Sequence, residues 1–341
     1  MTAASNLPGI SEMKSPSSSS SLRRALLRWE GILFAILVAI CVFNAFASPY
    51  FLNPYNLFDS TQIFSEKAIL ALSMALIIIV RDIDLSVASI VALVSTVIGW
   101  LATQGFGAPA LVLVALVVGT AAGMLNGLLV TRFGVPAILV TIGTMSLFRG
   151  VSYIMLGDSA FTVYPEGFSE FGQGVLLGMV PYEFLAFLVL AVAFGIVLHR
   201  TVFGRDIFAI GNNPQGALYS GIRVDAYRFW LFTVNGLICG LVAVFFTSRI
   251  GATRPNMAQG WELDAIAMVV LGGVSIAGGS GTIPGVVISA FVIGMLTFGL
   301  GLLNVPGILM TIVVGALVIS AIALPILGRR VSNLWSVLLH G

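Results

Sequence analysis

The chain has 341 residues, of which 58% are hydrophobic and only 9% are charged, and its net charge is +2. Because a water-facing surface normally carries about 25% charged residues, this composition excludes a water-soluble enzyme, a nucleic-acid-binding protein and a disordered scaffold. It is typical of an all-α, polytopic membrane protein. Ten spans of roughly 20 residues would use about 200 residues and leave room for loops.

The first 28 residues are polar, with a Ser- and Pro-rich stretch from Ser15 to Ser21. Such a composition favours disorder, so residues 1–28 are predicted to be a disordered N-terminus. Arg23, Arg24 and Arg28 then precede the first apolar run, as in a signal peptide. No small-residue cleavage site follows, so we expect this run to be a retained first span.

Ten apolar segments are candidate membrane spans. They are 31–48, 63–80, 86–103, 109–130, 135–156, 181–199, 229–248, 263–277, 284–303 and 306–327. The sequence thus predicts a transmembrane domain over residues 29–330, with about ten helices, and a tail over 331–341. With the N-terminus inside, twelve basic residues lie inside, Lys67, Arg249 and Arg254 lie outside, and Arg149 lies within a span. This asymmetry fits the positive-inside rule and predicts that both termini are cytoplasmic.

Two hydrophilic loops separate the spans. The loop over 157–180 carries acidic residues and no Lys or Arg, as an external loop should. The loop over 200–228 carries four arginines and is predicted to be cytoplasmic. Within it, Asn213 before Pro214 is a helix-start signal and Gly221 a stop signal, which predicts a short helix of about two turns. Taken alone, such a helix could lie at the lipid interface.

Polar residues near the second span are candidates for a transport pathway. Arg81, Asp82, Asp84 and Ser86 follow that span. They can form a boundary turn in which Asp84 or Ser86 caps the next helix, or a polar hairpin that lines the pathway. Arg149 lies roughly 21 Å along its span, counted at 1.5 Å per residue. It can reach the outer interface or face a cavity, where it would bind hydroxyls or helix-end carbonyls.

No enzyme, cofactor or metal site is predicted. The turn over 278–285 is rich in glycine but lacks the lysine of a phosphate-binding loop. The two histidines, His199 and His340, lie at a span end and in the tail, and Cys41 and Cys239 lie inside apolar runs. These residues provide neither a base for a nucleophilic serine nor a metal-binding cluster. The segments 79–86 and 270–277 resemble each other weakly, as the repeats of transporters do.

Four stretches of the chain are similar to the permeases of bacterial ATP-binding-cassette importers for monosaccharides, of the ribose, xylose, arabinose, rhamnose and autoinducer-2 type. They are IDLSV (83–87), VPAILVTIGT with Arg149-Gly150 (135–150), the stretch from Gly204-Arg205 to Ser220-Gly221-Ile222 (204–222), and the stretch from ELDAIA to VVLGGVSIAGGSG (262–281). The resemblance covers about residues 30–328. Within it, Asp82, Asp84, Ser86, Thr141, Arg149 and Ser275 are the candidate pathway residues.

The chain departs from this family pattern at three places. Arg81-Asp82 replaces the Gly-Gly found in many members, a variant that looks more like the autoinducer-2 and rhamnose permeases. Ala88 replaces a usual glycine. The loop that contacts the ATPase in the wider superfamily carries Glu-Ala-Ala-x3-Gly, whereas the stretch 215–221 keeps only the second alanine and the glycine.

The resemblance implies a permease subunit in the bacterial inner membrane that forms the pathway for a monosaccharide or an autoinducer-2-like solute. The implied partners are an ATPase, expected as fused double nucleotide-binding domains, a second permease copy or paralogue, and a periplasmic sugar-binding protein. ATP hydrolysis would belong to the partner. The short helix would then dock in a groove of the ATPase. Its coupling residues would be Asn213, Pro214, Gln215, Ala217 and Gly221.

One alternative is a secondary transporter of a small polar solute, driven by an ion gradient. Such proteins usually bury a coupling carboxylate or an ion site in mid-membrane, whereas the acidic residues here cluster at the ends of the predicted spans. An intramembrane enzyme is disfavoured because the sequence lacks a suitable pair of His and Ser.

Overall fold

The computed structural model describes residues 29–320 and 323, so the predicted N-terminus over 1–28 and tail over 331–341 lie outside the described residues. The described chain is mostly helical, as predicted. Its named helices are α2 (Trp29–Ala47), α3 (Pro54–Ile79), α4 (Val87–Thr103), α5 (Ala108–Thr131), α6 (Ala137–Leu156), α7 (Glu170–Gln173), α8 (Tyr182–Arg200), α9 (Val202–Asn212), α10 (Pro214–Tyr219), α11 (Val224–Ile250), α12 (Trp261–Leu271) and α13 (Ile283–Leu302). A further apolar helix covers Gly307–Ser320.

Two very short strands interrupt the helical pattern. β1 (Val175–Leu176) and β2 (Val180–Pro181) pair in antiparallel fashion, with Leu176 opposite Val180. The prediction was an all-α fold, and this small two-stranded sheet in the described part of the chain differs from it.

Seven described helices are long and apolar enough to cross a membrane, namely α2, α3, α5, α6, α8, α11 and α13. The other three predicted spans coincide with shorter helices, which are α4, α12 and Gly307–Ser320. The polytopic character is therefore confirmed. The total of ten spans and the sidedness of the termini stay predictions.

Two helix boundaries differ from the predicted spans by more than five residues. α3 begins at Pro54 rather than near 63, because the Asn53 side chain accepts the Tyr55 N–H at 3.0 Å and proline suits the first helical position. α12 ends at Leu271 rather than at 277, where Gly272 and Gly273 follow and Gly273 has φ of 86°. Hydropathy alone predicts neither the polar start of α3 nor the end of α12 at Leu271.

α3 and α11 form the centre of the bundle. In its most apolar stretch α3 is 83% buried and α11 is 72% buried, whereas α2 is 11% and α6 28% buried. A helix that is hydrophobic all round is suited to such a central place. The outer helices α2, α5, α6 and α8 expose large apolar side chains, as lipid-facing helices do.

α5 and α11 approach each other along a seam of glycines. Gly119 and Gly123 on α5 face Gly236 and Gly240 on α11, each pair spaced by four residues. A Cβ on Gly123 would come within 2.3 Å of the Phe232 carbonyl oxygen, and one on Gly236 within 2.3 Å of the Gly119 carbonyl oxygen. Only glycine permits this backbone contact, which is a common way for membrane helices to associate.

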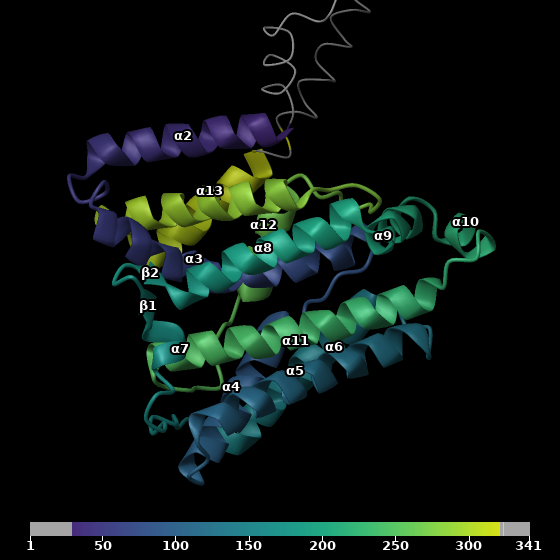
Figure 1. The fold of residues 1–341 in the computed structure, drawn as a ribbon, viewed down its shortest axis with the longest axis horizontal. Helices are drawn as coiled ribbons and strands as arrows, with labels where there is room; N and C mark the ends of the chain where they lie inside the picture. The colour runs from purple at the N-terminus through teal and green to yellow at the C-terminus, as the bar shows by residue number, and fades with distance from the viewer. Residues whose placement is uncertain (1–28, 321–322, 324–341) are drawn as a thin grey trace, which may run out of the picture.

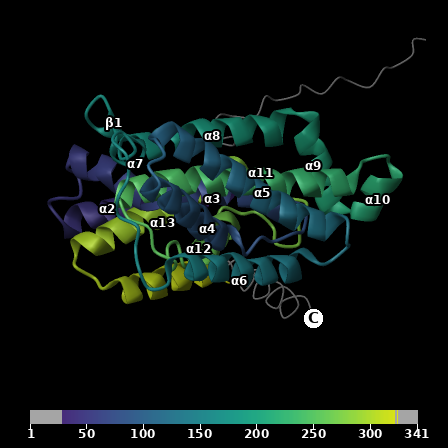
Figure 2. The same ribbon diagram turned by 90° about the horizontal axis from the view of Figure 1, so that it is seen from below.

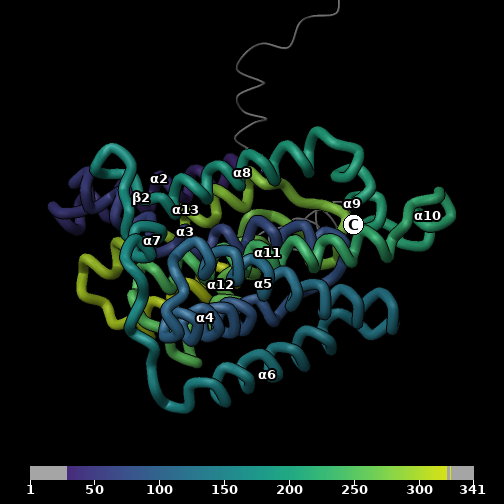
Figure 3. Tube along the Cα trace, turned by 60° about the horizontal axis from the view of Figure 1, so that its bottom comes forward, coloured from purple at the N-terminus to yellow at the C-terminus, as the bar shows by residue number. Residues whose placement is uncertain are grey.

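The long helices run along the molecule, and its two ends differ (Figure 1). The end that carries α7, β1 and β2 is called the α7 end, and the opposite end, where α9 and α10 project, is called the α10 end. Figure 2 shows the same separation of α7 and α10 from below. In Figure 3, α6 lies along one edge of the molecule.

α2 lies on the outside and packs mainly on α13. Its buried Asn44 donates from Nδ2 to the Met295 carbonyl at 2.9 Å. Trp29 Nε1 donates to the Leu271 carbonyl at the end of α12 at 2.8 Å. The first described helix is thus attached to the last third of the chain.

Candidate functional site

The connection between α3 and α4, residues 80–86, forms a sharp elbow at the α10 end. The Arg81 N–H donates to the Ile78 carbonyl at 3.0 Å, and the Asp82 N–H donates to the Ile77 carbonyl at 3.1 Å. These two bonds form a Schellman motif, in which Arg81 takes the left-handed position with φ of 71°. For a residue other than glycine this conformation costs about 1–2 kcal/mol, so the side chain of Arg81 needs compensating interactions.

The Arg81 side chain finds these interactions at the end of α9. Its Nε donates to the Gly211 carbonyl at 2.6 Å, and its Nη2 donates to the Asn212 carbonyl at 2.7 Å. Both carbonyls belong to the last turn of a helix, where the negative end of the helix dipole favours a cation. Charge-assisted bonds of this kind contribute about 1.5–3 kcal/mol each, which offsets the backbone strain.

Asp82 forms a two-point ion pair with the beginning of α11. Arg228 donates from Nε to Asp82 Oδ2 and from Nη2 to Oδ1, both at 2.6 Å. The Asp82 side chain is 7% exposed and that of Arg228 24%. The parallel geometry fixes direction as well as distance.

Asp84 lies at the centre of a fully buried polar cluster. Its Oδ1 accepts the N–H of Ser86 at 2.8 Å and the hydroxyl of Ser86 at 2.6 Å, and its Oδ2 accepts from Asn235 Nδ2 of α11 at 2.9 Å. Asn126 of α5 donates to Ser86 Oγ at 2.8 Å, and Ser73 of α3 donates to Asn235 Oδ1 at 2.6 Å. The elbow and α11 therefore bind the Asp84 carboxylate directly. α5 and α3 join the cluster through Ser86 and Asn235.

This cluster bears on the two roles considered for the segment. Ser86 is the N-cap residue of α4, but its side chain makes no capping bond, because its hydroxyl donates to Asp84 and accepts from Asn126. The segment is thus a boundary turn, and its part in a pathway stays a prediction. Asp84 and Ser86 are both fully buried, so in this conformation they lie in the wall of the bundle and not on an open surface.

The six candidate pathway residues lie at three places, which are the elbow, the turn after α12 and the opposite end of the molecule. Thr141 of α6 joins Asp82, Asp84 and Ser86, since its hydroxyl donates to the Ile83 carbonyl at 3.2 Å. Ser275 lies in the turn after α12, where its N–H donates to the Ser280 carbonyl at 3.0 Å.

Arg149 lies at the other end of the molecule. Its Nη1 donates to the carbonyls of Pro255 and Met257, both at 2.7 Å. It therefore binds backbone carbonyls of the loop between α11 and α12, and its part in a transport pathway stays a prediction.

The short helix predicted in the 200–228 loop is present as α10. Asn213 caps it, since its side chain accepts the Gly216 N–H at 3.0 Å, and Pro214 occupies the first helical position. Gly221 follows the helix with φ of 87°, as its stop signal predicts. The local signals in the sequence were therefore sufficient to place this helix.

The surface of α10 differs from the expected one at Ala217. This side chain is 5% exposed and lies against its own chain, because the helix turns it towards α9 and α11. The outward surface is formed by Gln215 and by Leu218 and Tyr219, which are 59% and 89% exposed. A small side chain at 217 thus permits packing within the chain.

The α7 end holds a second buried charge cluster. Arg249 of α11 donates from Nε and Nη2 to the carboxylate of Glu66 on α3, at 3.0 and 2.8 Å. Glu183 at the start of α8 is equally buried, and its nearest carboxylate oxygen lies 3.7 Å from Arg249 Nε. Among the described residues, neither Glu183 carboxylate oxygen has a hydrogen-bond partner.

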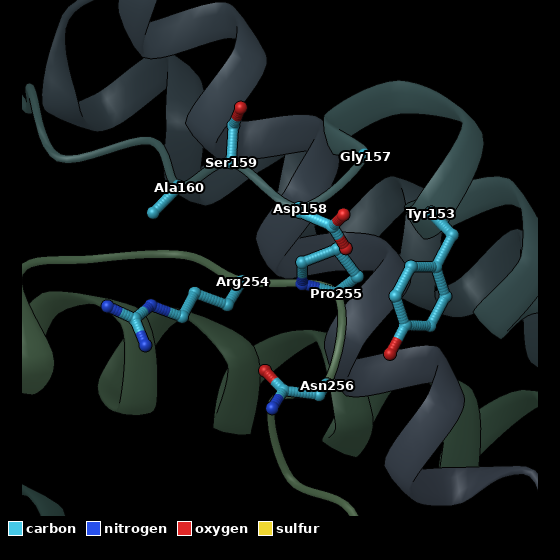
Figure 4. A pocket seen from close by; sticks show the side chains of 8 residues that line it. All are labelled: Tyr153, Gly157, Asp158, Ser159, Ala160, Arg254, Pro255 and Asn256. Atoms are coloured by element: carbon cyan, nitrogen blue, oxygen red, sulfur yellow. The ribbon is translucent and has the colours of Figure 1, made fainter.

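A polar pocket of about 440 Å³ opens at the α7 end, beside the end of α6 (Figure 4). It is lined by Tyr153, Gly157, Asp158, Ser159, Ala160, Arg254, Pro255 and Asn256. The two loops that form it are joined by a backbone bridge between Phe161 and Thr253. Burial raises the pKa of the nearby Tyr164 to about 12, although its hydroxyl shares a hydrogen bond with Thr253 Oγ1. The neutral hydroxyl of Tyr164 therefore joins the two loops through Thr253.

Several members of these clusters were missed in the sequence, although they carry a signal. Glu66, Ser73, Asn126 and Asn235 are polar residues inside apolar runs, and such residues usually face the interior of a bundle. Their partners lie far away in the chain, so spacing could not pair them. Among the described residues, no cluster of three His, Cys, Asp or Glu side chains could hold a metal ion.

Comparisons with known proteins match most of the chain. Residues 56–322 match the family described as the branched-chain amino acid transport system / permease component. The autoinducer 2 import system permease protein LsrC of Yersinia enterocolitica is 37% identical over 257 residues, which are 74% of this chain and 71% of that protein. Its counterpart in Yersinia pseudotuberculosis is 38% identical over 258 residues, 74% of this chain and 73% of that protein. No solved structure matches the chain.

Proposed function

Because the chain belongs to the family of branched-chain amino acid transport system permease components, we propose that it carries a small polyhydroxylated solute, a monosaccharide or an autoinducer-2-like molecule, across the inner membrane. The chain is the permease subunit of an ATP-binding-cassette importer, and it is an inner-membrane protein. The family description names amino acids, whereas the printed names of the two relatives give autoinducer 2. The choice of a sugar-like solute follows these relatives and the IDLSV segment at 83–87.

One observation supports coupling to a separate ATPase more than any other. α10 projects from the bundle as a short helix (Figure 1) that is capped at both ends. Its Leu218 and Tyr219 side chains are exposed. Two large apolar side chains at a water-facing tip favour a covering partner. A helix that enters a groove of the ATPase would cover them. Asn213, Pro214 and Gly221 then shape the helix, Ala217 seats it on its own chain, and Gln215 borders the docking surface.

The remaining partners follow from this assignment. The α10 end would be cytoplasmic, in agreement with the arginines of the 200–228 loop. The α7 end would face the periplasm and a sugar-binding protein. The apolar outer helices leave room for a second permease, as an identical copy or a paralogue. The ATPase is expected as fused double nucleotide-binding domains.

The polar elbow between α3 and α4 would act on the pathway indirectly. Asp82, Asp84, Ser86 and Thr141 lie inside the protein, so they would shape the gate near the cytoplasm by holding the helices that border it. Arg149 would hold the periplasmic loop in the same way. Ser275, in the turn after α12, remains a candidate for direct contact with the solute.

The test is reconstitution of the permease in proteoliposomes with its ATPase and its loaded binding protein. Uptake is measured with labelled autoinducer 2, ribose, xylose, arabinose and rhamnose. We expect uptake of at least one of these solutes to require ATP and to cease with a catalytically inactive ATPase. Uptake that persists with the inactive ATPase and follows an ion gradient would instead identify a secondary transporter.

A further inference from the structure

Two neighbouring residues of the α3–α4 elbow hold both chain connections of α10. Arg81 binds the carbonyls of Gly211 and Asn212, which directly precede the α10 cap. Asp82 binds Arg228, on the first turns of the helix that follows α10. The short helix therefore cannot shift as a body without pulling on at least one of these two contacts.

Further contacts make the base of α10 a single unit. Asn212 also donates from Nδ2 to the Gly279 carbonyl at 3.0 Å, and the Gly279 N–H donates to the Ile79 carbonyl at 2.9 Å. The hydroxyl of Tyr227 on α11 donates to the carboxylate of Asp206 on α9. α9, the base of α10 and the start of α11 are thus joined to each other and to the end of α3.

The same elbow continues into the buried polar cluster. Asp82 and Asp84 are two residues apart, and their partners Arg228 and Asn235 are seven residues apart on α11. Seven residues are about two helical turns, so both partners lie on one face of α11. The outer pair and the buried pair therefore join the same two segments in register. A movement of the outer pair would therefore act on the segments that hold Asp84.

Space for such a movement exists beneath α10. A cavity of about 200 Å³ is lined by Arg81, Asp82, Arg228 and Pro214, with apolar neighbours. It separates the first turn of α10 from the elbow. Arg81 and Asp82, together with the groups that they bind, are called the polar clamp. The polar clamp thus borders a small cavity and not tightly packed side chains.

We propose that Arg81 and Asp82 are positioning residues that couple displacement of α10 to the buried Asp84 cluster. The proposal rests on the proposed role of α10 as the surface that meets the ATPase. It explains why an arginine occupies a left-handed position, where glycine would be free of strain. The side chain at this position binds the end of α9, which glycine could not do.

The decisive variant is Arg81→Gly. Glycine suits the left-handed position, so this variant removes one arm of the clamp while it favours the local backbone. Asn304→Gly is a matched control. Asn304 follows α13 with φ of 56° and forms the same pair of backbone bonds, to Gly301 and from Val305 to Leu300, but it does not contact α9 or α10.

Both variants are purified with the ATPase and tested in proteoliposomes. Uptake uses whichever labelled solute of the panel the wild-type complex transports. We expect Arg81→Gly to remain folded and to retain ATPase co-purification and basal hydrolysis, while uptake falls about tenfold. Asn304→Gly should transport like the wild type. A solute-independent readout is hydrogen exchange of residues 80–86, which ATP with vanadate should change in the wild-type complex and leave unchanged in Arg81→Gly.

Three outcomes would overturn the coupling role. The first is normal uptake by Arg81→Gly. The second is a change in hydrogen exchange of residues 80–86 in Arg81→Gly that equals the change in the wild type. The third is complete loss of ATPase binding by Arg81→Gly, which would show that Arg81 only shapes α10. The docking role of α10 is tested separately by Leu218→Asp with Tyr219→Ser. If this double variant binds the ATPase normally, the proposed docking surface is wrong. If it loses the ATPase while Arg81→Gly transports normally, the function stands and the clamp does not.

Discussion

The two ends of the α3–α11 pair carry different kinds of buried charge cluster, about 30 Å apart along α11. At the α10 end one aspartate meets one arginine in a two-point pair, with Asp82 and Arg228 joined at 2.6 Å. At the α7 end one guanidinium, that of Arg249, faces two buried carboxylates, and only Glu66 is hydrogen-bonded to it. The first is a one-to-one pair, whereas the second places an additional, unbonded carboxyl group beside its arginine.

This difference indicates different tasks. A matched pair with defined geometry keeps two segments in register, which suits an end that must pass on a displacement. A buried carboxyl group without a hydrogen bond raises the free energy of the folded state, because its desolvation is not repaid. Glu183 therefore lowers the contribution of the α7 end to the folding free energy. Three measurements would break or sharpen the comparison.

The largest expected effect is that of Arg249→Ala. This change leaves Glu66 and Glu183 buried without their cation, which costs about 3–5 kcal/mol of folding free energy. We expect a clear fall in the melting midpoint of the detergent-solubilised protein, or loss of folded protein altogether. Arg254→Ala, an exposed arginine at the same end, is the control and should melt like the wild type. An equal melting midpoint for Arg249→Ala would show that the α7 cluster does not hold the helices together.

An intermediate effect is expected from Asp82→Ala, which leaves Arg228 without its partner. The loss of two charge-assisted bonds at a partly exposed site should cost about 2 kcal/mol. The exchanged pair, Asp82→Arg with Arg228→Asp, should recover part of this loss in the same melting experiment. If the exchanged pair recovered no stability, the position of each charged group, and not only the presence of opposite charges, would determine the strength of the ion pair.

The smallest effect is expected from Glu183→Gln. Replacement of the unbonded carboxyl group by a neutral amide should leave the melting midpoint unchanged or raise it by the equivalent of about 1 kcal/mol. Glu66→Gln is the matched comparison, and it should cost about 2 kcal/mol because the Arg249 bonds lose their charged acceptor. If both variants were destabilised equally, the α7 end would be as well matched as the α10 end.

The sequence predicted the features that depend on local signals. The Asn213-Pro214 pair and Gly221 placed α10, since a cap, a first-turn proline and a left-handed residue act within a few residues. Composition alone identified a polytopic helical protein. Four stretches, from 83–87 to 262–281, carried the family resemblance.

What the sequence could not predict depends on partners far away in the chain. Asp82 and Arg228 are 146 residues apart, and Asp84 and Asn235 are 151 residues apart. No periodicity brings them together, because their meeting depends on how α3, α4 and α11 pack. The orientation of Ala217 towards its own chain depends in the same way on the packing of α9 and α11.

The attachment of α2 to α13 has a consequence for the order in which the protein is made. Asn44 and its partner Met295 are 251 residues apart. At roughly 5–20 residues per second, a ribosome needs about 13–50 s between them. During that time α2 is already in the bilayer with a polar amide that has not met its acceptor. The first described helix to be synthesised is thus among the last to reach its final place, and any delay in translating the second half of the chain lengthens that wait.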